Sequence, residues 1–142
     1  MGKHRARIYF CIFGDDFPLD DLTNDLGIAP TERYKQGEEV TRGKIVRRRL
    51  ETAWFLDSDY QDANYFEVQI KKIIEPLRKN EHIINAYKKQ YDLQCKIFMV
   101  LYFGEFQTPG LYLDSELIEF AHNVGAEFDI DIYNENINDE VE

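Results

Sequence analysis

Two segments of the chain are apolar on both faces when they are read as extended strands. They are RARIYFCIF (Arg5–Phe13) and IFMVLYF (Ile97–Phe103), and a glycine follows each of them. Alternate side chains of a strand point to opposite faces of a sheet, so a strand that is apolar at both sets of positions needs at least partial cover on both sides. The two segments are therefore predicted to be the central strands of a sheet.

Three further segments have helical periodicity. The first is FPLDDLTNDLG (Phe17–Gly27), with Pro18 at its start and Gly27 just past its end. The second covers residues 64–91, where we predict a kink or a break near Glu75 because Pro76 lacks the backbone N–H that a helix uses. The third is LDSELIEFAHNVG (Leu113–Gly125), for which Asp114 is the predicted N-cap.

Two segments alternate with the period of a strand. Residues 45–57 alternate between an apolar side, with Val46, Leu50, Trp54 and Leu56, and a charged side, which predicts a long strand with one buried face or a bent hairpin. Residues 127–133 predict a last strand with Phe128, Ile130 and Ile132 inward. The element order favours a two-layer α+β fold with a ferredoxin-like sheet of four to six mostly antiparallel strands and helices packed on it.

The core of this fold can be predicted from the apolar stripes of the same elements. The side chains expected to be buried together are Phe10, Ile12, Trp54, Met99, Leu101, Leu117, Phe120, Ile130 and Ile132.

One domain is expected over residues 1–133, because 142 residues with 44% hydrophobic content suit a single core. Residues 134–142 are polar and acidic, and we expect this tail to be disordered. One pattern occurs twice: a strand, a glycine, an acidic residue, a phenylalanine and a helix that ends at a glycine. An internal duplication explains the pattern, and so does the general similarity of strand–helix units.

The composition suggests where the protein works and what it avoids. The sequence contains no apolar run long enough to span a membrane and no signal peptide, so a cytoplasmic protein without membrane contact is expected. Cys11 and Cys95 fall inside predicted strands and are expected to pack in the core. A formal net charge of -10 opposes binding to nucleic acid and favours a basic protein partner. The oligomeric state stays open.

The order of several motifs resembles a known family. These motifs are FGDDFPLDDLTNDLGIAPTERYKQGE, the tryptophan in ETAWFLDS, the central helical segment and LYLDSELIEFAHNVGAEFDIDIY, which together span about Arg5 to Tyr133. They resemble the bacterial family known as domain of unknown function 4279 (DUF4279). Val124 replaces the usual leucine, and the segment RGKIVRRR (Arg42–Arg49) is unusually basic. The resemblance implies no activity; it suggests a small bacterial binding or inhibitory protein, with immunity-type proteins among its relatives.

Motifs for catalysis or cofactor binding are absent from the sequence. His4, His82 and His122 have no metal-ligand spacing, no GxSxG elbow occurs, and no glycine-rich phosphate loop is found. We therefore expect no catalytic residues, no cofactor and no enzymatic activity. An enzyme that uses carboxylates as acid and base is the least favoured of the functions considered.

The carboxylates of Glu127, Asp129 and Asp131 form the most regular charged pattern. Their spacing puts them on one face of the last strand, where two of them could share a divalent ion. Arg47 and Arg49 would offset these charges if the two strands were neighbours. We favour this pairing or a solvated face, so no metal site is expected.

The main candidate site lies in the loops after the two central strands. Its residues are Asp15, Asp16, Phe17, Glu105, Phe106 and Tyr112. If the two halves were related by pseudo-symmetry, both loops would lie at the same sheet edge and form one surface for a basic protein. The predicted function is therefore a protein-binding or immunity-type inhibitory module.

An alternative site lies in the basic segment that precedes the tryptophan. Arg42, Arg47 and Arg49, together with Tyr34, would hold an anionic or aromatic small molecule such as a nucleotide. This alternative would be favoured if replacing these arginines abolished binding while replacing the loop residues of the main candidate site left binding normal.

Overall fold

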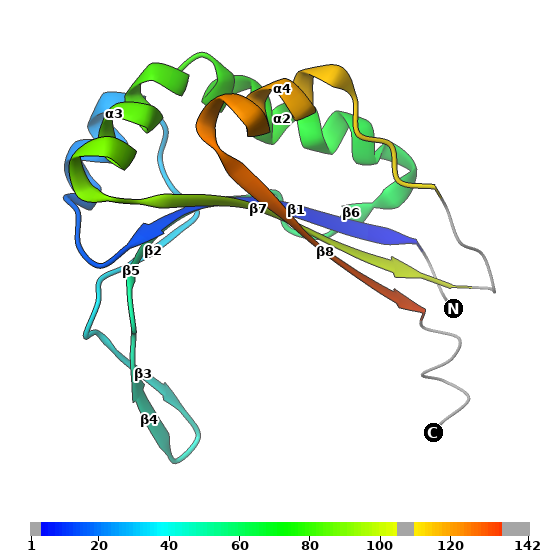
Figure 1. Cartoon of the computed structure of the whole chain (residues 1–142). Helices are drawn as coiled ribbons and strands as arrows, with labels where there is room; N and C mark the ends of the chain where they lie inside the picture. Colours follow the sequence, from blue (N-terminus) through cyan, green and yellow to red (C-terminus); the bar gives the residue numbers. More distant parts are fainter. Residues whose placement is uncertain (1–3, 105–109, 135–142) are drawn as a thin grey trace.

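The computed structural model describes residues 4–104 and 110–134, which form two layers, a twisted sheet and a set of helices on one of its faces (Figure 1). This confirms the predicted α+β class with a mostly antiparallel sheet. The tail from residue 135 onward and the loop residues Glu105 and Phe106 lie outside the described residues.

The main sheet has six strands, in the order β2-β5-β1-β7-β8, with β6 paired to one end of β1. These strands are β1 (Arg5–Gly14), β2 (Glu32–Tyr34), β5 (Thr52–Asp57), β6 (Gln61–Asp62), β7 (Gln94–Phe103) and β8 (Ala126–Asn134). Neighbouring strands are antiparallel except for the parallel pair β7 and β8. The two segments predicted to be central, β1 and β7, are indeed neighbours in the middle of the sheet.

The helices are α1 (Leu19–Leu26), α2 (Phe66–Arg78), α3 (Glu81–Tyr91) and α4 (Ser115–Val124), with a 3-10 turn, η1 (Ala63–Tyr65), before α2. The predicted break in the long helical segment occurs between α2 and α3, with Pro76 in the last turn of α2. The Asp114 side chain accepts a hydrogen bond from the backbone N–H of Leu117 at 2.9 Å, which confirms the predicted N-cap. None of the described helices is long and apolar enough to cross a membrane.

The core lies between the helices and the sheet. Trp54, Phe10 and Phe120 are fully buried there, and the Trp54 indole N–H donates to the hydroxyl of Thr23 at 3.1 Å. The prediction for Ile132 is wrong, because this side chain is 57% exposed. It lies near the end of β8, an edge strand that lacks a neighbour on its outer side in the described part of the chain.

A separate two-stranded hairpin leaves the main sheet between β2 and β5. Its strands are β3 (Glu39–Arg42) and β4 (Ile45–Arg48), and we call residues Glu39–Arg48 the arm. Figure 1 shows the arm extending away from the sheet on the side opposite the helices. Gly43 begins the turn with φ of 62°, which is the left-handed region that a two-residue hairpin turn requires.

The arm corrects the prediction for residues 45–57, which form neither one long strand nor a bent hairpin of their own, because β4 pairs with β3 and β5 pairs with β1 and β2. The segment leaves the main sheet before Thr52, so its first part has no core to face. Val46 and Leu50, which were predicted to share a buried face with Trp54, are 58% and 89% exposed.

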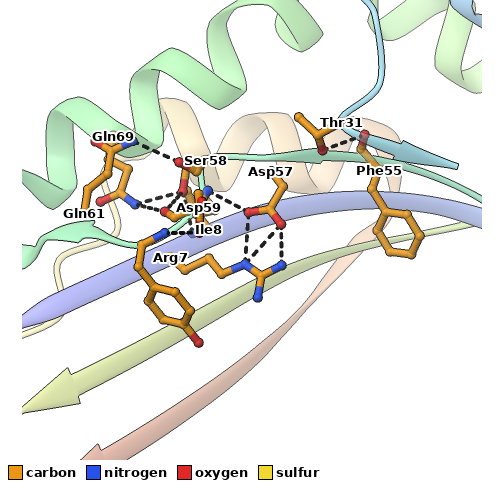
Figure 2. A network of polar contacts seen from close by, with 10 residues as sticks. Arg7, Ile8, Thr31, Phe55, Asp57, Ser58, Asp59, Gln61 and Gln69 are labelled. Atoms are coloured by element: carbon orange, nitrogen blue, oxygen red, sulfur yellow. Dashed lines mark hydrogen bonds and ion pairs between the residues drawn. The ribbon is translucent and has the colours of Figure 1, made fainter. Parts of the chain in front are cut away.

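A buried glutamine ties α2 to the sheet (Figure 2). The Gln69 side-chain amide donates to the carbonyl oxygens of Ala6 and Asp59 and to the Ser58 hydroxyl, at 2.8, 3.1 and 2.8 Å. The Ser58 hydroxyl also accepts from the backbone N–H of Ile8 and donates to the carbonyl of Asp59. Gln69 therefore fixes the turn after β5 against β1 and α2.

Candidate functional site

The predicted partner surface is divided between the two ends of the sheet. β1 and β7 are antiparallel, with Phe13 opposite Gln94 and Arg5 opposite Tyr102. The loop after β1 therefore starts at one end of the sheet and the loop after β7 at the other, about 30 Å apart for strands of ten residues. The prediction that both loops form one surface is therefore wrong. The repeated pattern predicts two strands, but it does not predict their relative direction.

The individual residues of that surface also differ in their surroundings. Phe17 is only 2% exposed and belongs to the core, whereas Asp15 and Asp16 are exposed, with Asp16 3.6 Å from the Lys35 ammonium. Tyr112 is 66% exposed and lies near α2, at the other end of the sheet.

The alternative site residues, in contrast, line one pocket. Tyr34, Arg42, Arg47 and Arg49 surround a cavity of about 500 Å³ at the junction of the arm and the main sheet. We call this cavity the arginine pocket. Its lining also includes Arg48, the apolar side chains of Val40, Ile45 and Leu50, and the carboxylate of Glu51.

The strand register of the arm explains why these cations converge. Arg47 lies directly opposite Val40, and Arg42 lies opposite Ile45, so all four side chains share the face of the arm that lines the pocket. The base of the arm is held by the backbone, where the N–H of Gly37 donates to the carbonyl of Arg49 at 2.8 Å. The side-chain amide of Gln36 adds a bond of 3.1 Å to the carbonyl of Leu50.

Two of the pocket arginines already have partners within the chain. The Arg49 guanidinium lies 3.9 Å from the centre of the Tyr34 ring and 4.0 Å from the Glu32 carboxylate. Arg48 pairs with Glu39 at 3.0 Å. No carboxylate of the described residues lies within 4.0 Å of Arg42 or Arg47. These two cations are therefore available to an anionic ligand.

Tyr34 forms the aromatic wall of the pocket and remains a neutral phenol near pH 7. Burial raises the pKa of Tyr34, and the positive charge of Arg49 opposes this shift. The ring and the stacked guanidinium together offer a flat surface with a positive edge.

An aromatic surface continues from the pocket across the face of the sheet that the helices leave uncovered, which we call the open face. The rings of Tyr34, Phe55, Tyr9 and Phe98 follow one another at 5.6, 6.1 and 4.6 Å between centres. These side chains are half-buried. Both faces of β1 and β7 were predicted to be covered at least in part, and on this face the neighbouring aromatic rings half-bury one another.

The acidic residues of β8 lie far from the basic segment in the sheet. Glu127, Asp129 and Asp131 are exposed on β8, which is separated from β5 by β1 and β7. Arg47 belongs to the arm, outside the main sheet, and Arg49 to its base. The expected pairing between these cations and the acidic strand is therefore wrong, whereas the exposure of the three carboxylates agrees with the alternative, a solvated face.

Removing divalent metal ions is expected to leave the melting temperature unchanged. The described residues contain no group of three or more histidine, cysteine or acidic side chains placed to hold an ion. A thermal melt with excess chelator tests this expectation. A decrease of several degrees that calcium or magnesium reverses would contradict it.

The comparisons with known proteins give one match. The family model described as domain of unknown function (DUF4279) matches residues 4–135, which is nearly the whole chain. No curated protein and no solved structure matches. The match covers every element of both layers, from β1 to β8, and agrees with the resemblance in the sequence. The chain therefore belongs to the DUF4279 family.

Proposed function

We propose that this protein is a non-enzymatic, cytoplasmic binding module that takes an anionic ligand in the arginine pocket. The observation that carries this proposal is the convergence of four arginines on one cavity whose lining contains one carboxylate, that of Glu51. Cations brought together in this way repel one another, so an anion that bridges them is stabilised.

The size and lining of the pocket favour a small molecule with a phosphate or carboxylate group. A volume of about 500 Å³ lies within the range of small-molecule sites. Arginine holds such groups with two parallel hydrogen bonds, and the apolar wall of Val40, Ile45 and Leu50 can contact the rest of the ligand. The Tyr34 ring favours a ligand that also carries a flat group.

The nucleophiles of the described structure support binding rather than catalysis. The Ser58 hydroxyl is used in three hydrogen bonds that hold a turn. Burial raises the pKa of the Cys95 thiol to about 12 and raises that of Cys11 further. Both thiols therefore stay protonated and unreactive at neutral pH.

Binding of a basic protein by the acidic loops is the less favoured function. Asp15 and Asp16 lie at the end of the sheet opposite Tyr112, so the loops do not form the single surface that this function assumed. An immunity-type inhibitory role remains a prediction that rests on the sequence resemblance.

The double substitution Arg42→Ser with Arg47→Ser is expected to weaken ligand binding by at least about 100-fold, because each charge-assisted hydrogen bond contributes about 1.5–3 kcal/mol. Isothermal titration calorimetry with ATP and with inorganic pyrophosphate as probes measures this loss. Binding by the parent chain should also weaken as the salt concentration rises.

The matched control is Lys71→Ser with Lys72→Ser, which removes two exposed cations from α2, away from the pocket. Equal losses in the two double variants would indicate a general charge effect. Normal binding after loss of Arg42 and Arg47 would refute the proposed site.

A further inference from the structure

The arm exposes apolar side chains that an isolated hairpin cannot bury. Ile45 and Val46 are 57% and 58% exposed, and Leu50 at the base of the arm is 89% exposed. Two-stranded hairpins without further packing are marginally stable in water, and exposed apolar side chains that are rimmed by charge are typical of protein interfaces. The arm therefore has the features of a segment that packs against another molecule.

The opposite edge of the sheet has the complementary features. β8 presents Glu127, Asp129 and Asp131, and none of the described cations lies within 4.0 Å of these carboxylates. Tyr133 lies on the same face of β8 as these carboxylates and is 42% exposed. One chain thus carries a basic and apolar arm at one edge and an acidic and apolar strand at the other.

The strand order allows these two features to meet in a symmetric pair. β1 lies near the middle of the sheet, between the β2 edge, from which the arm extends, and the β8 edge. A two-fold axis that runs along β1 beneath the open face would therefore place the β2 edge of one copy over the β8 edge of the other. Both arms and both acidic strands would then be paired, and the assembly would be closed.

The register places the arm beside a particular part of β8. Tyr34 lies opposite Ala53, Ala53 opposite Phe13, and Phe13 opposite Gln94. Gln94 directly precedes Cys95, which pairs with Ala126, the first residue of β8. These pairings place Tyr34, which precedes the arm, and Ala126 at nearly the same position along the strand direction. Rotation about an axis along β1 does not change that position, so the arm would meet the first half of β8, where Glu127 and Asp129 lie.

We propose that two copies of the chain form a symmetric dimer through their open faces, with the arm of each copy against Glu127 and Asp129 of the other. The half-buried rings of Tyr9, Phe55 and Phe98 lie between the arm and β8 and form the apolar centre of the interface. The opposite charges of the arm and of β8 fix the relative orientation of the two copies.

The dimer can be tested without a ligand. A ligand-free buffer is needed, because the dimer and an anionic ligand would both use Arg42 and Arg47. Sedimentation equilibrium in a ligand-free buffer of low salt should give a mass twice the 16.9 kDa of one chain. Glu127→Arg with Asp129→Arg should weaken the dimer by about 100-fold or more, since like charges then face each other. Arg42→Glu with Arg47→Glu should have the same effect, because these cations have no carboxylate partner within their own chain.

An equimolar mixture of the two double variants should form dimers again. In that pair each arm meets a β8 edge of opposite charge, whereas each variant alone combines like charges at both contacts. Circular dichroism should show that both variants are folded, since the substituted side chains are exposed. The matched control, Glu67→Arg with Glu75→Arg on the outer side of α2, should leave the dimer intact.

Three results would overturn this proposal: a parent chain that is monomeric at all concentrations, a dimer that survives both charge reversals, and a mixture that stays monomeric. The Glu127→Arg with Asp129→Arg variant keeps the arginine pocket, so its affinity for ATP or pyrophosphate reports on the proposed function separately. A parent chain that dimerises, together with a monomeric variant that binds neither probe, would refute the proposed ligand alone. Probe binding by a parent chain that is already monomeric in ligand-free buffer would refute the dimer alone.

Discussion

Replacing Leu117 with alanine is expected to lower the free energy of unfolding by about 2–5 kcal/mol. Leu117 is 2% exposed and anchors α4 in the core between the helices and the sheet. The substitution removes buried methyl groups and leaves a cavity that the packed surroundings fill only in part. Because small domains are stable by about 5–15 kcal/mol, this loss is a large share of the total, and urea denaturation measures it.

The next residue of the same helix supplies a matched control. Ile118 has the same number of side-chain carbons as Leu117, but it is 52% exposed. Ile118→Ala should therefore change the free energy of unfolding by less than about 1 kcal/mol. Similar losses for the two variants would show that the face of α4 that packs on the sheet has been assigned wrongly.

The substitution Gln69→Glu is expected to destabilise the fold by about 2–4 kcal/mol at neutral pH, because the carbonyl oxygens of Ala6 and Asp59 lose their donor. Gln69 is 2% exposed, so the new carboxylate is also placed in a site with little water. Denaturant unfolding at neutral pH measures the loss.

The destabilisation by Gln69→Glu should become smaller as the pH falls. Burial raises the pKa of the introduced carboxyl group in the folded state above its value of about 4.3 in the unfolded chain. The folded variant therefore binds more protons than the unfolded one, so its stability relative to the parent rises as the pH decreases toward about 4. Protonation also restores one donor to the network.

Gln61→Glu is the control for this pH dependence. The Gln61 amide donates to the carbonyl of Ser58 at 3.0 Å in the same turn, but the side chain is exposed. Its substitution should cost little at any pH between about 4 and 7. If the effect of Gln69→Glu were as small or independent of pH, the buried network in Figure 2 would not contribute to stability as described.

Local sequence patterns were sufficient to predict most of the helices and the central strands. The N-cap at Asp114, the left-handed glycines Gly27 and Gly125, and the break that follows Pro76 each depend on residues close together in the chain. Backbone geometry at such positions is set by the residue itself, so the pattern and the structure agree.

The relative direction of β1 and β7 could not be predicted in the same way. Strand periodicity is identical for either direction, and the direction depends on how the intervening elements cross the sheet. The arm was missed for a related reason: residues 45–57 alternate throughout, yet the part before Thr52 leaves the sheet. Alternation predicts an extended segment, but it does not show which surface the apolar side chains contact.

The two candidate sites differ in the same respect. Arg42 and Arg47 lie within a short hairpin and Arg49 directly follows it, so a local turn at Gly43 is enough to bring them together. The site formed from the loops after β1 and β7 required two distant segments to end at the same edge of the sheet. The aromatic open face could have been found from the tyrosine and phenylalanine residues that alternate along β1 and β7.

The most direct test of the arginine pocket is an NMR titration of the isotope-labelled chain with ATP, which follows the amide resonance of each residue. The proposed function predicts that the largest shifts occur at Tyr34 and from Val40 to Glu51, with little change in the loop from Asp15 to Phe17. Shifts confined to that loop or to the helices, or no shifts at a saturating ATP concentration, would contradict an anion site in the arginine pocket.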